Sequence, residues 1–302
     1  MKKWLPALVV LLLLAAACAP EEEATPSDGS TGAGGAATAA ECASSVESDL
    51  VNSGSLTVGT GNPAFPPWWE GGTSKEHGEW EVNDPYKGKG YEGATLFAVA
   101  EELGFSRDQV QFVPVPFAES FAPGPQNFDF VLQQISYSAK RAQRVDFSDS
   151  YYDVSQGLVS YEGSPIENAT SFSDLKDAKL GTQIGTTSHD YIVNNVKPAT
   201  EPSVYPSFTG AIADLKSESI DGIVTDLPSA FFITAVQVPN GVIVGQFPTV
   251  GTQEHFAMAF RKGSPLVECV NKALATLRKS GELADIEQKW LADKASAPVI
   301  ED

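Results

Sequence analysis

One arginine and two serines follow an apolar run in the middle of the chain, and together they could bind a carboxylate. Arg141 lies three residues after Ser138 and five after Ser136. If the preceding strand ends near Ile135 and a helical turn begins near Ser138, two hydroxyls, backbone N–H groups and a planar guanidinium converge on one point. A guanidinium matches the geometry of a carboxylate with two parallel hydrogen bonds. The sequence therefore predicts a carboxylate-binding site at this point.

The tract Phe128–Tyr152, which contains this arginine, resembles the amino-acid-binding family of solute-binding proteins that serve ABC importers. In that family a strand leads to a hydroxyl residue, an apolar residue and T-x-x-R, followed by V-x-F-S-x-x-Y-Y; here Ser138 stands in place of the threonine. The resemblance covers nearly all of residues 50–295. It implies that the Arg141 guanidinium binds the α-carboxylate of a bound amino acid through two hydrogen bonds, with Ser136 and Ser138 as hydroxyl partners.

The same resemblance implies a second set of ligand-binding residues. Gly185 starts a turn similar to the G-T-T turn of the family, in which Thr186 and Thr187 would meet the same carboxylate through hydroxyls and backbone N–H groups. Asp226 matches the family aspartate that pairs with the α-ammonium, and its place directly before a leucine and a proline also predicts a helix N-cap. Gln134 stands where the family often has a small residue whose carbonyl receives the ammonium. Its side chain would add a contact or narrow the pocket.

The loop after the first expected strand carries Asn62, Phe65 and Trp68. The resemblance places a ligand-stacking aromatic residue here, which Phe65 or Trp68 matches, although the neighbouring prolines could also hold these rings as packing residues. Asn62 stands near a position where binders of basic amino acids often carry aspartate, which favours an uncharged polar ligand. Glu70 or Asp84 could reverse that preference, so a basic ligand ranks second and an acidic ligand third.

Strand-like and helix-like segments alternate over most of the chain, which indicates an α/β protein too long for one small core. The resemblance implies the two-lobe, periplasmic-binding-protein-like fold of type II. Residues 44–155 and 255–302 would form lobe I, and residues 156–254 would form lobe II. Two crossover strands, near Gly157–Tyr161 and Phe256–Phe260, would act as the hinge. Open α/β sheets bind ligands at the carboxyl ends of their strands, where the candidate residues lie.

The N-terminal segment has the pattern of an export signal. Residues 1–17 carry two lysines and then an apolar run that is short for a bilayer span. The tract Leu14–Cys18 resembles a bacterial lipobox, which predicts lipidation of Cys18; ordinary cleavage after Ala15–Ala17 is the alternative. Residues 18–43 lack hydrophobic periodicity, which predicts a disordered tether. We therefore expect an exported protein that is lipid-anchored at the outer face of the cytoplasmic membrane or is periplasmic.

Two further cysteines, Cys42 and Cys269, could pair in an exported protein. Such a disulfide would pin the start of the fold to a late helix, whereas a buried free thiol on the apolar face of that helix is the alternative for Cys269.

The formal net charge of the chain is −19, which makes nucleic acid an unsuitable partner. We expect a monomer whose partners are an amino acid as small-molecule ligand, the membrane subunits of an ABC importer and, through the lipid, the membrane.

No catalytic or metal-binding motif stands out in the sequence. His77, His189 and His255 share no motif with a nucleophile, and no group of His, Cys and carboxylates has metal spacing. We therefore expect neither an enzyme nor a cofactor, although the same fold includes dehydratases, and a sensor that presents its ligand to a receptor is a third possibility.

The polar loop at residues 70–89 is longer than the family usually has and could cover the pocket, contact the transporter or be a surface insertion.

Overall fold

The computed structural model describes residues 37–78, 80–292, 294 and 296–301. The chain divides into two units, residues 1–36 and residues 37–302. The expected signal segment at 1–17, Cys18 and the tether before residue 37 lie outside the described residues. Within the described ranges, no helix is both long enough and apolar enough to cross a membrane.

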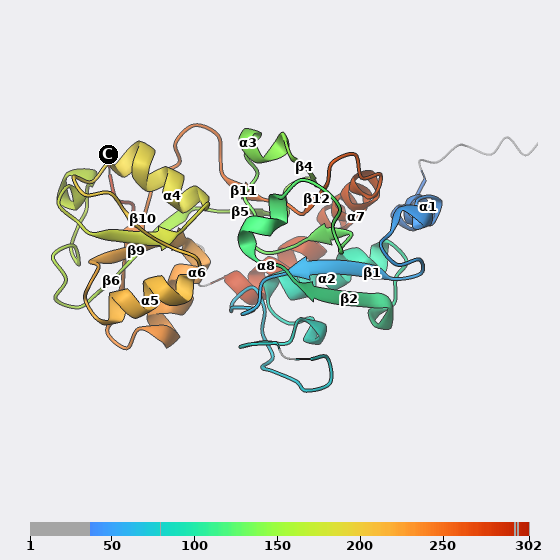
Figure 1. The fold of residues 1–302 in the computed structure, drawn as a ribbon, viewed down its shortest axis with the longest axis horizontal. Helices are drawn as coiled ribbons and strands as arrows, with labels where there is room; N and C mark the ends of the chain where they lie inside the picture. The colour runs from blue at the N-terminus through green and yellow to red at the C-terminus, as the bar shows by residue number, and fades with distance from the viewer. Residues whose placement is uncertain (1–36, 79, 293, 295, 302) are drawn as a thin grey trace, which may run out of the picture. The chain divides into compact units, whose positions relative to one another are not determined.

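Lobe I is built around a five-stranded mixed sheet (Figure 1). Its strands, in spatial order, are β2 Val110–Pro114, β1 Leu56–Thr60, β3 Phe130–Val131, β12 Ala259–Arg261 and β4 Val145–Phe147. β1 runs parallel to β2 and β3, whereas β12 is antiparallel to both of its neighbours. Every residue of β1 is buried, as expected of a central strand that is covered on both faces.

Three helices of lobe I pack against one another beside this sheet: α2 Tyr91–Glu102, α7 Leu266–Ser280 and α8 Glu282–Leu291. Helix α7 has one buried face, because its apolar side chains recur at helical spacing: Leu266, Cys269, Val270, Ala273, Leu274 and Leu277. It ends at Gly281, whose φ of +87° is a left-handed conformation that glycine tolerates best. Apart from the first helix, described below, the other helical segments of this lobe are short: η1 Glu47–Asp49, η2 Pro85–Lys87, η3 Arg107–Gln109, η4 Phe117–Phe121 and α3 Ala139–Ala142.

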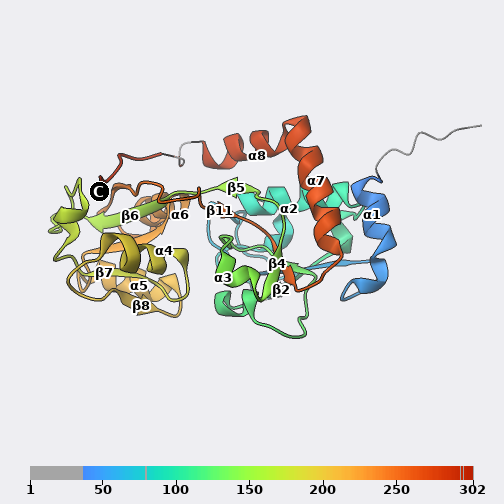
Figure 2. The same cartoon turned by 90° about the horizontal axis from the view of Figure 1, so that it is seen from above.

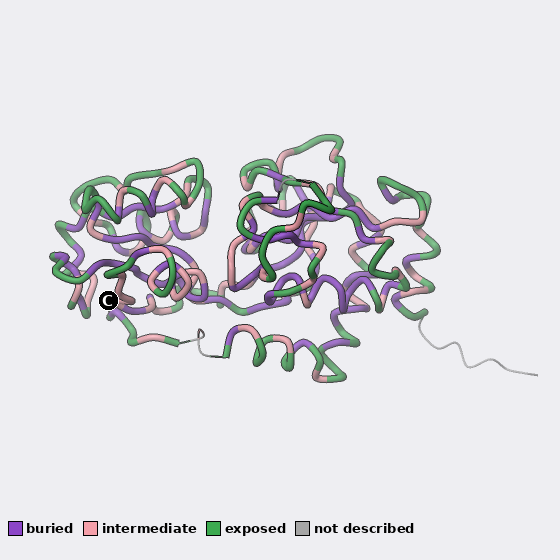
Figure 3. The backbone as a smooth tube through the Cα atoms, turned by 90° about the horizontal axis from the view of Figure 1, so that it is seen from below, coloured by how far each residue is buried: buried purple, intermediate pink, exposed green. Residues whose placement is uncertain are grey.

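Lobe II contains a second five-stranded sheet. Its strands, in spatial order, are β10 Gly241–Gln246, β6 Gln156–Tyr161, β9 Gly222–Asp226, β7 Leu180–Gln183 and β8 Ser203–Tyr205. Its helical segments are η5 Phe172–Leu175, α4 Thr187–Tyr191, α5 Phe208–Lys216 and α6 Leu227–Phe232, with the π-helical turns η6 Ile192–Val196 and η7 Ile233–Gln237 continuing α4 and α6. Leu158 and Val224 belong to one apolar cluster and their neighbours Val159 and Ile223 to another. Because side chains alternate along a strand, both faces of this sheet are buried, and the buried backbone runs through its centre (Figure 3).

The hinge consists of two short antiparallel strands, β5 Tyr152–Asp153 and β11 His255–Phe256. The sequence placed the first crossover near Gly157–Tyr161, and this was wrong, because those residues pair with β9 and β10 inside the sheet of lobe II. The second crossover, expected at Phe256–Phe260, divides between β11 in the hinge and β12 in lobe I.

The end of the chain belongs to lobe II, which corrects the expectation that all of residues 255–302 lie in lobe I. The N–H of Gln246 donates to the carbonyl of Pro298 over 2.8 Å, and the N–H of Ile300 donates back to the carbonyl of Gln246 over 2.9 Å. Ile300 is 1% exposed and belongs to an apolar cluster of lobe II. After α8 the chain therefore crosses between the lobes a third time (Figure 2).

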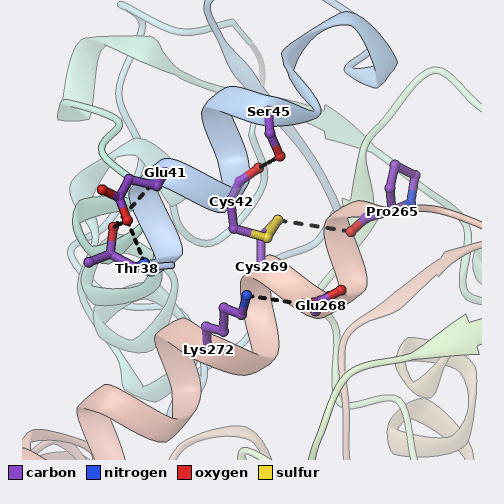
Figure 4. Close-up of a disulfide and its surroundings, with 8 residues drawn as sticks. All are labelled: Thr38, Glu41, Cys42, Ser45, Pro265, Glu268, Cys269 and Lys272. Carbon is purple, nitrogen blue, oxygen red and sulfur yellow. Dashed lines mark hydrogen bonds and ion pairs between the residues drawn. A yellow bond between two sulfur atoms is a disulfide. The ribbon is translucent and has the colours of Figure 1, made fainter. Parts of the chain in front are cut away.

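The fold begins earlier than the tether expected at residues 18–43 would allow. Helix α1, Ala39–Ser45, starts with a capping box between Thr38 and Glu41, in which each residue satisfies a backbone N–H of the other. A disulfide joins Cys42 of α1 to Cys269 of α7, as the sequence predicted (Figure 4). The disulfide and the contacts between α1 and α7 attach this first helix to lobe I.

Candidate functional site

A cavity of about 540 Å³ lies between the two lobes. Lobe I lines it with the loops after β1, β2 and β3, and lobe II lines it with the loops after β7 and β9. All of these loops follow the carboxyl ends of strands, where open α/β sheets place their ligands. Seven of the ten predicted ligand-binding residues line the cavity: Asn62, Phe65, Gln134, Ser136, Thr186, Thr187 and Asp226.

Asp226 carries the only charged side chain among the described residues that line the cavity. One carboxylate oxygen accepts the N–H of Ser229 over 2.9 Å, which makes Asp226 the N-cap of α6, as the sequence predicted. Burial raises the pKa of Asp226 to about 6, although the hydrogen bonds from Ser229 lower it. The nearby charge of Glu254 adds to the increase. A ligand cation would relieve this burial penalty by pairing with the carboxylate.

Hydroxyls from opposite lobes meet at another part of the cavity wall. The Ser136 Oγ of lobe I lies 3.2 Å from the Thr187 Oγ1 of lobe II. Both hydroxyls donate to one carboxylate oxygen of Glu254, over 2.5 Å and 2.6 Å. Thr186 is the N-cap of α4 and donates its hydroxyl to the carbonyl of Gln183. The structure thus brings Ser136 and Thr187 together, and both hydroxyls donate their protons in hydrogen bonds to Glu254.

Arg141 does not line the cavity, although the sequence placed its guanidinium on the ligand. Its Nη1 donates to the Ser136 carbonyl over 2.6 Å and its Nη2 to the Gly185 carbonyl over 2.9 Å. The guanidinium also lies 4.6 Å from the ring centre of Phe121. Burial lowers the pKa of Arg141 to about 10, a shift that the negative charges of Glu254 and Asp190 oppose. Backbone carbonyls from both lobes therefore hold the guanidinium behind Ser136.

Ser138 also stands away from the cavity wall. Its hydroxyl accepts the backbone N–H of Arg141 over 3.2 Å, which caps the short helix α3. The predicted hydroxyl partner of a ligand is therefore a helix N-cap, because the turn that begins here uses its oxygen.

The aromatic lining differs in part from the prediction. Trp68 is fully buried, and its indole N–H donates to the Ser229 Oγ over 2.8 Å, which links lobe I to lobe II. Its ring packs edge-on against Tyr91, Tyr152 and Phe256. Sequence reasoning missed the lining rings Phe117, Phe208, Phe232 and Phe256. A pattern search gives no signal for them, since each also fits a position in the apolar core.

A buried acid supports the cavity wall at Gln134. Gln134 adopts φ +52°, and its N–H donates to Glu92 Oε1 over 2.7 Å, while its side-chain amide donates to Glu92 Oε2. The Tyr151 hydroxyl donates to Glu92 as well. Burial raises the pKa of Glu92 to about 7, although these three hydrogen bonds lower it. The strand that was expected to end near Ile135 ends at Val131 instead, because this bent backbone follows β3.

The long loop at residues 70–89 folds on itself beside lobe I. The imidazole of His77 lies 3.1 Å from the carboxylate of Asp84 and stacks on the ring of Tyr86, with ring centres 4.0 Å apart. Asp84 is buried, and its carboxylate also accepts the N–H of Tyr86. Neither Glu70 nor Asp84 lines the cavity. Within the described part of the chain, no group of three or more His, Cys, Asp or Glu residues could hold a metal ion.

A model of the family described as bacterial extracellular solute-binding proteins, family 3, matches residues 72–293. The chain belongs to this family. Membership explains the two-lobe arrangement and the position of the cavity, and it agrees with the expected export of the protein.

Curated relatives of this family member bind amino acids. The chain is 26% identical to the arginine-binding extracellular protein ArtP of Bacillus subtilis strain 168, over 72% of this chain and 84% of the relative. It is also 26% identical to the ABC transporter glutamine-binding protein GlnH of the same organism, over 65% of this chain and 70% of the relative.

Solved structures of the family share the fold. An ancestral arginine-binding protein bound to glutamine is 31% identical to this chain, with a TM-score of 0.63 over 78% of this chain and 97% of the ancestral protein. The similar proteins are thus extracellular amino-acid-binding proteins, including components of ABC transporters.

Proposed function

We propose that this protein captures an amino acid with an uncharged polar side chain between its two lobes and delivers it to the membrane subunits of an ABC importer. One observation carries the proposal: a cavity between the lobes has aromatic and uncharged polar walls, and Asp226 is the one charged side chain among its described lining residues. Such a wall suits a ligand with one ammonium group and no further charge on its side chain.

Asp226 is the proposed partner of the α-ammonium. Its carboxylate uses one oxygen to cap α6 and retains lone pairs for a second donor. Because burial already raises its pKa, an ammonium group in the cavity would be held by a charge-assisted hydrogen bond in a place with little competing water.

Uncharged groups of the cavity wall are proposed to bind the ligand side chain. The lining includes amide side chains from both lobes, which can donate and accept hydrogen bonds: Asn62, Gln133, Gln134, Gln183 and Gln237. A basic side chain would call for a second carboxylate in the wall, and Glu70 and Asp84 do not line it. The glutamine-binding relative and the glutamine-bound ancestral protein are consistent with a neutral polar ligand.

Ser136 and Thr187 are the proposed partners of the ligand carboxylate. Their hydroxyls lie 3.2 Å apart on opposite lobes, so one carboxylate could accept from both and join the lobes. Arg141 would support this site by holding the Ser136 carbonyl and by placing a positive charge behind the hydroxyls. Its role is then indirect, in contrast to the direct grip that the family resemblance implies.

We propose binding without chemistry. An enzyme of this fold would need an acid at the reacting centre. Glu92 has a suitable pKa, but it lies behind Gln134 and does not line the cavity. We further propose that the protein is a monomer, anchored at the membrane by a lipid on Cys18.

A thermal-shift screen of residues 19–302 against the twenty amino acids tests the function. A ligand at one hundred times its dissociation constant adds about 2.7 kcal/mol of stability. We expect the largest shift from a neutral polar amino acid and its loss in Asp226→Asn. A response to none of the amino acids, together with a response to another acid or amine, would contradict the proposed function.

A further inference from the structure

Glu254, in the segment between β10 and β11, holds the hydroxyls that a ligand carboxylate would need. Its Oε1 accepts from Ser136 of lobe I over 2.5 Å and from Thr187 of lobe II over 2.6 Å. Its Oε2 accepts the side-chain amide of Gln156 over 2.9 Å, and Gln156 in turn accepts the hydroxyl of Ser188 over 2.7 Å. One carboxylate of the chain thus bridges the two lobes.

The neighbours of Glu254 belong to the cavity wall. Ser136, Gln156, Thr187 and Ser188 all line the cavity. Each hydroxyl has a single proton, so Ser136 and Thr187 cannot donate to Glu254 and to a second carboxylate at the same time. Two carboxylates sharing these donors would also repel each other in a partly buried site. Binding of a ligand carboxylate here and binding of Glu254 therefore exclude each other.

The hinge fixes the backbone of Glu254, but the side chain has room to rotate away from the two hydroxyls. The Glu254 carbonyl accepts the N–H of Val154 over 2.9 Å, beside the β5 and β11 pairing. The residue is only partly buried. Its side chain can rotate toward solvent without any change in the hydrogen bonds of the hinge backbone.

We propose that Glu254 is a built-in competitor of the ligand carboxylate: its carboxylate joins Ser136 to Thr187 across the lobes, and a bound ligand must displace it. This inference rests on the proposed function for its ligand, but its bridging role concerns the chain alone. Glu254 therefore sets how strongly the protein favours a ligand with a free carboxylate over the corresponding amine.

Pairs of compounds that differ only in the carboxylate test the competition. We would measure the affinities of L-glutamine and 4-aminobutanamide, and of L-arginine and agmatine, by calorimetry for the wild type, Glu254→Gln and Glu254→Ala. The ratio of affinities within a pair cancels any effect of the variant on lobe opening. In the wild type, a ligand carboxylate must displace the charged Glu254 carboxylate from two hydrogen-bond donors. We therefore expect the ratio of acid affinity to amine affinity to rise by about tenfold or more in Glu254→Ala. Glu254→Gln should raise it less.

Asp190→Asn is the matched control. Asp190 also acts on Arg141 through its negative charge, but its side chain is exposed and makes no contact with the two hydroxyls. We expect an unchanged acid-to-amine ratio in this variant. An equal increase in Asp190→Asn and Glu254→Ala would assign the effect to overall charge, and an unchanged or reduced ratio in Glu254→Ala would overturn the proposal.

A second measurement separates this proposal from the proposed function. After partial unfolding and refolding to remove copurified ligand, small-angle scattering would compare the radius of gyration of wild type and Glu254→Ala. Loss of the bridge predicts a larger radius for the variant. If neither compound of either pair binds any variant, the proposed function fails, and an unchanged radius would then refute the role of Glu254 as well.

Discussion

Replacing Glu92 by glutamine should change how the stability of the protein depends on pH. Glu92 is completely buried, and burial raises its pKa from 4.5 to about 7. A raised pKa means that the folded state binds the proton more tightly than the unfolded state. The associated stability is complete below pH 4.5 and is lost as the pH rises through about 7.

The size of the effect follows from the shift. Each pKa unit corresponds to about 1.4 kcal/mol, so ionisation of Glu92 lowers the free energy of unfolding by roughly 3 kcal/mol between pH 4.5 and pH 8. Glutamine keeps an oxygen for Tyr151 and the N–H of Gln134, and a flip of the Gln134 amide would satisfy the new NH2 group. Glu92→Gln should therefore remove the Glu92 contribution to the pH dependence without leaving an unpaired group.

Urea unfolding of wild type and variant at several pH values between 4.5 and 8, followed by tryptophan fluorescence, measures this difference. Asp226 adds a pH dependence of the same sign in both proteins, because burial raises its pKa too, so the difference between the curves measures Glu92 together with its charge interaction with Asp226. Glu101→Gln, an exposed position on the same helix, should run parallel to wild type. Parallel curves for wild type and Glu92→Gln would refute the reasoning and mean that water reaches this carboxylate.

Two further predictions concern the framework of lobe I. Gly90→Ala should destabilise the protein by about 1–3 kcal/mol more than Gly281→Ala. Both glycines have a φ near +87°, but a Cβ at Gly90 meets the Trp68 backbone whereas one at Gly281 meets nothing within 4 Å; chemical denaturation measures the difference. Replacing Cys42 and Cys269 by serine should cost about 2–4 kcal/mol, because their disulfide closes a loop between residues 227 positions apart. A reductant should then lower the melting temperature of wild type but leave that of the double variant unchanged.

Local patterns predicted the parts of the site that depend on neighbouring residues. Asp226 follows a buried apolar strand and precedes a leucine and a proline, and these signals placed it correctly at a strand end and a helix start. The pairing of Cys42 with Cys269 could be predicted because few cysteines were available and export permits a disulfide. The alternation of strands and helices indicated the α/β class for the same local reason, whereas the two lobes were implied by the family resemblance.

Contacts between distant residues could not be predicted in this way. The direction of the Arg141 side chain depends on the Gly185 carbonyl, 44 residues away and in the other lobe. Glu254 has no motif around it, and only the folded hinge brings it to Ser136 across 118 residues. Ile300 gives no sign in the sequence that it leaves lobe I, because a short apolar tail fits either core.

The third crossing of the chain between the lobes sets an upper limit on their separation. Leu291 is buried in the core of lobe I, and the Pro298 carbonyl is bonded to lobe II. The seven residue steps between them can span at most about 25 Å. Any opening that keeps both ends in place therefore leaves these two points within about 25 Å of each other, so the lobes can rotate about this edge but cannot move further apart there.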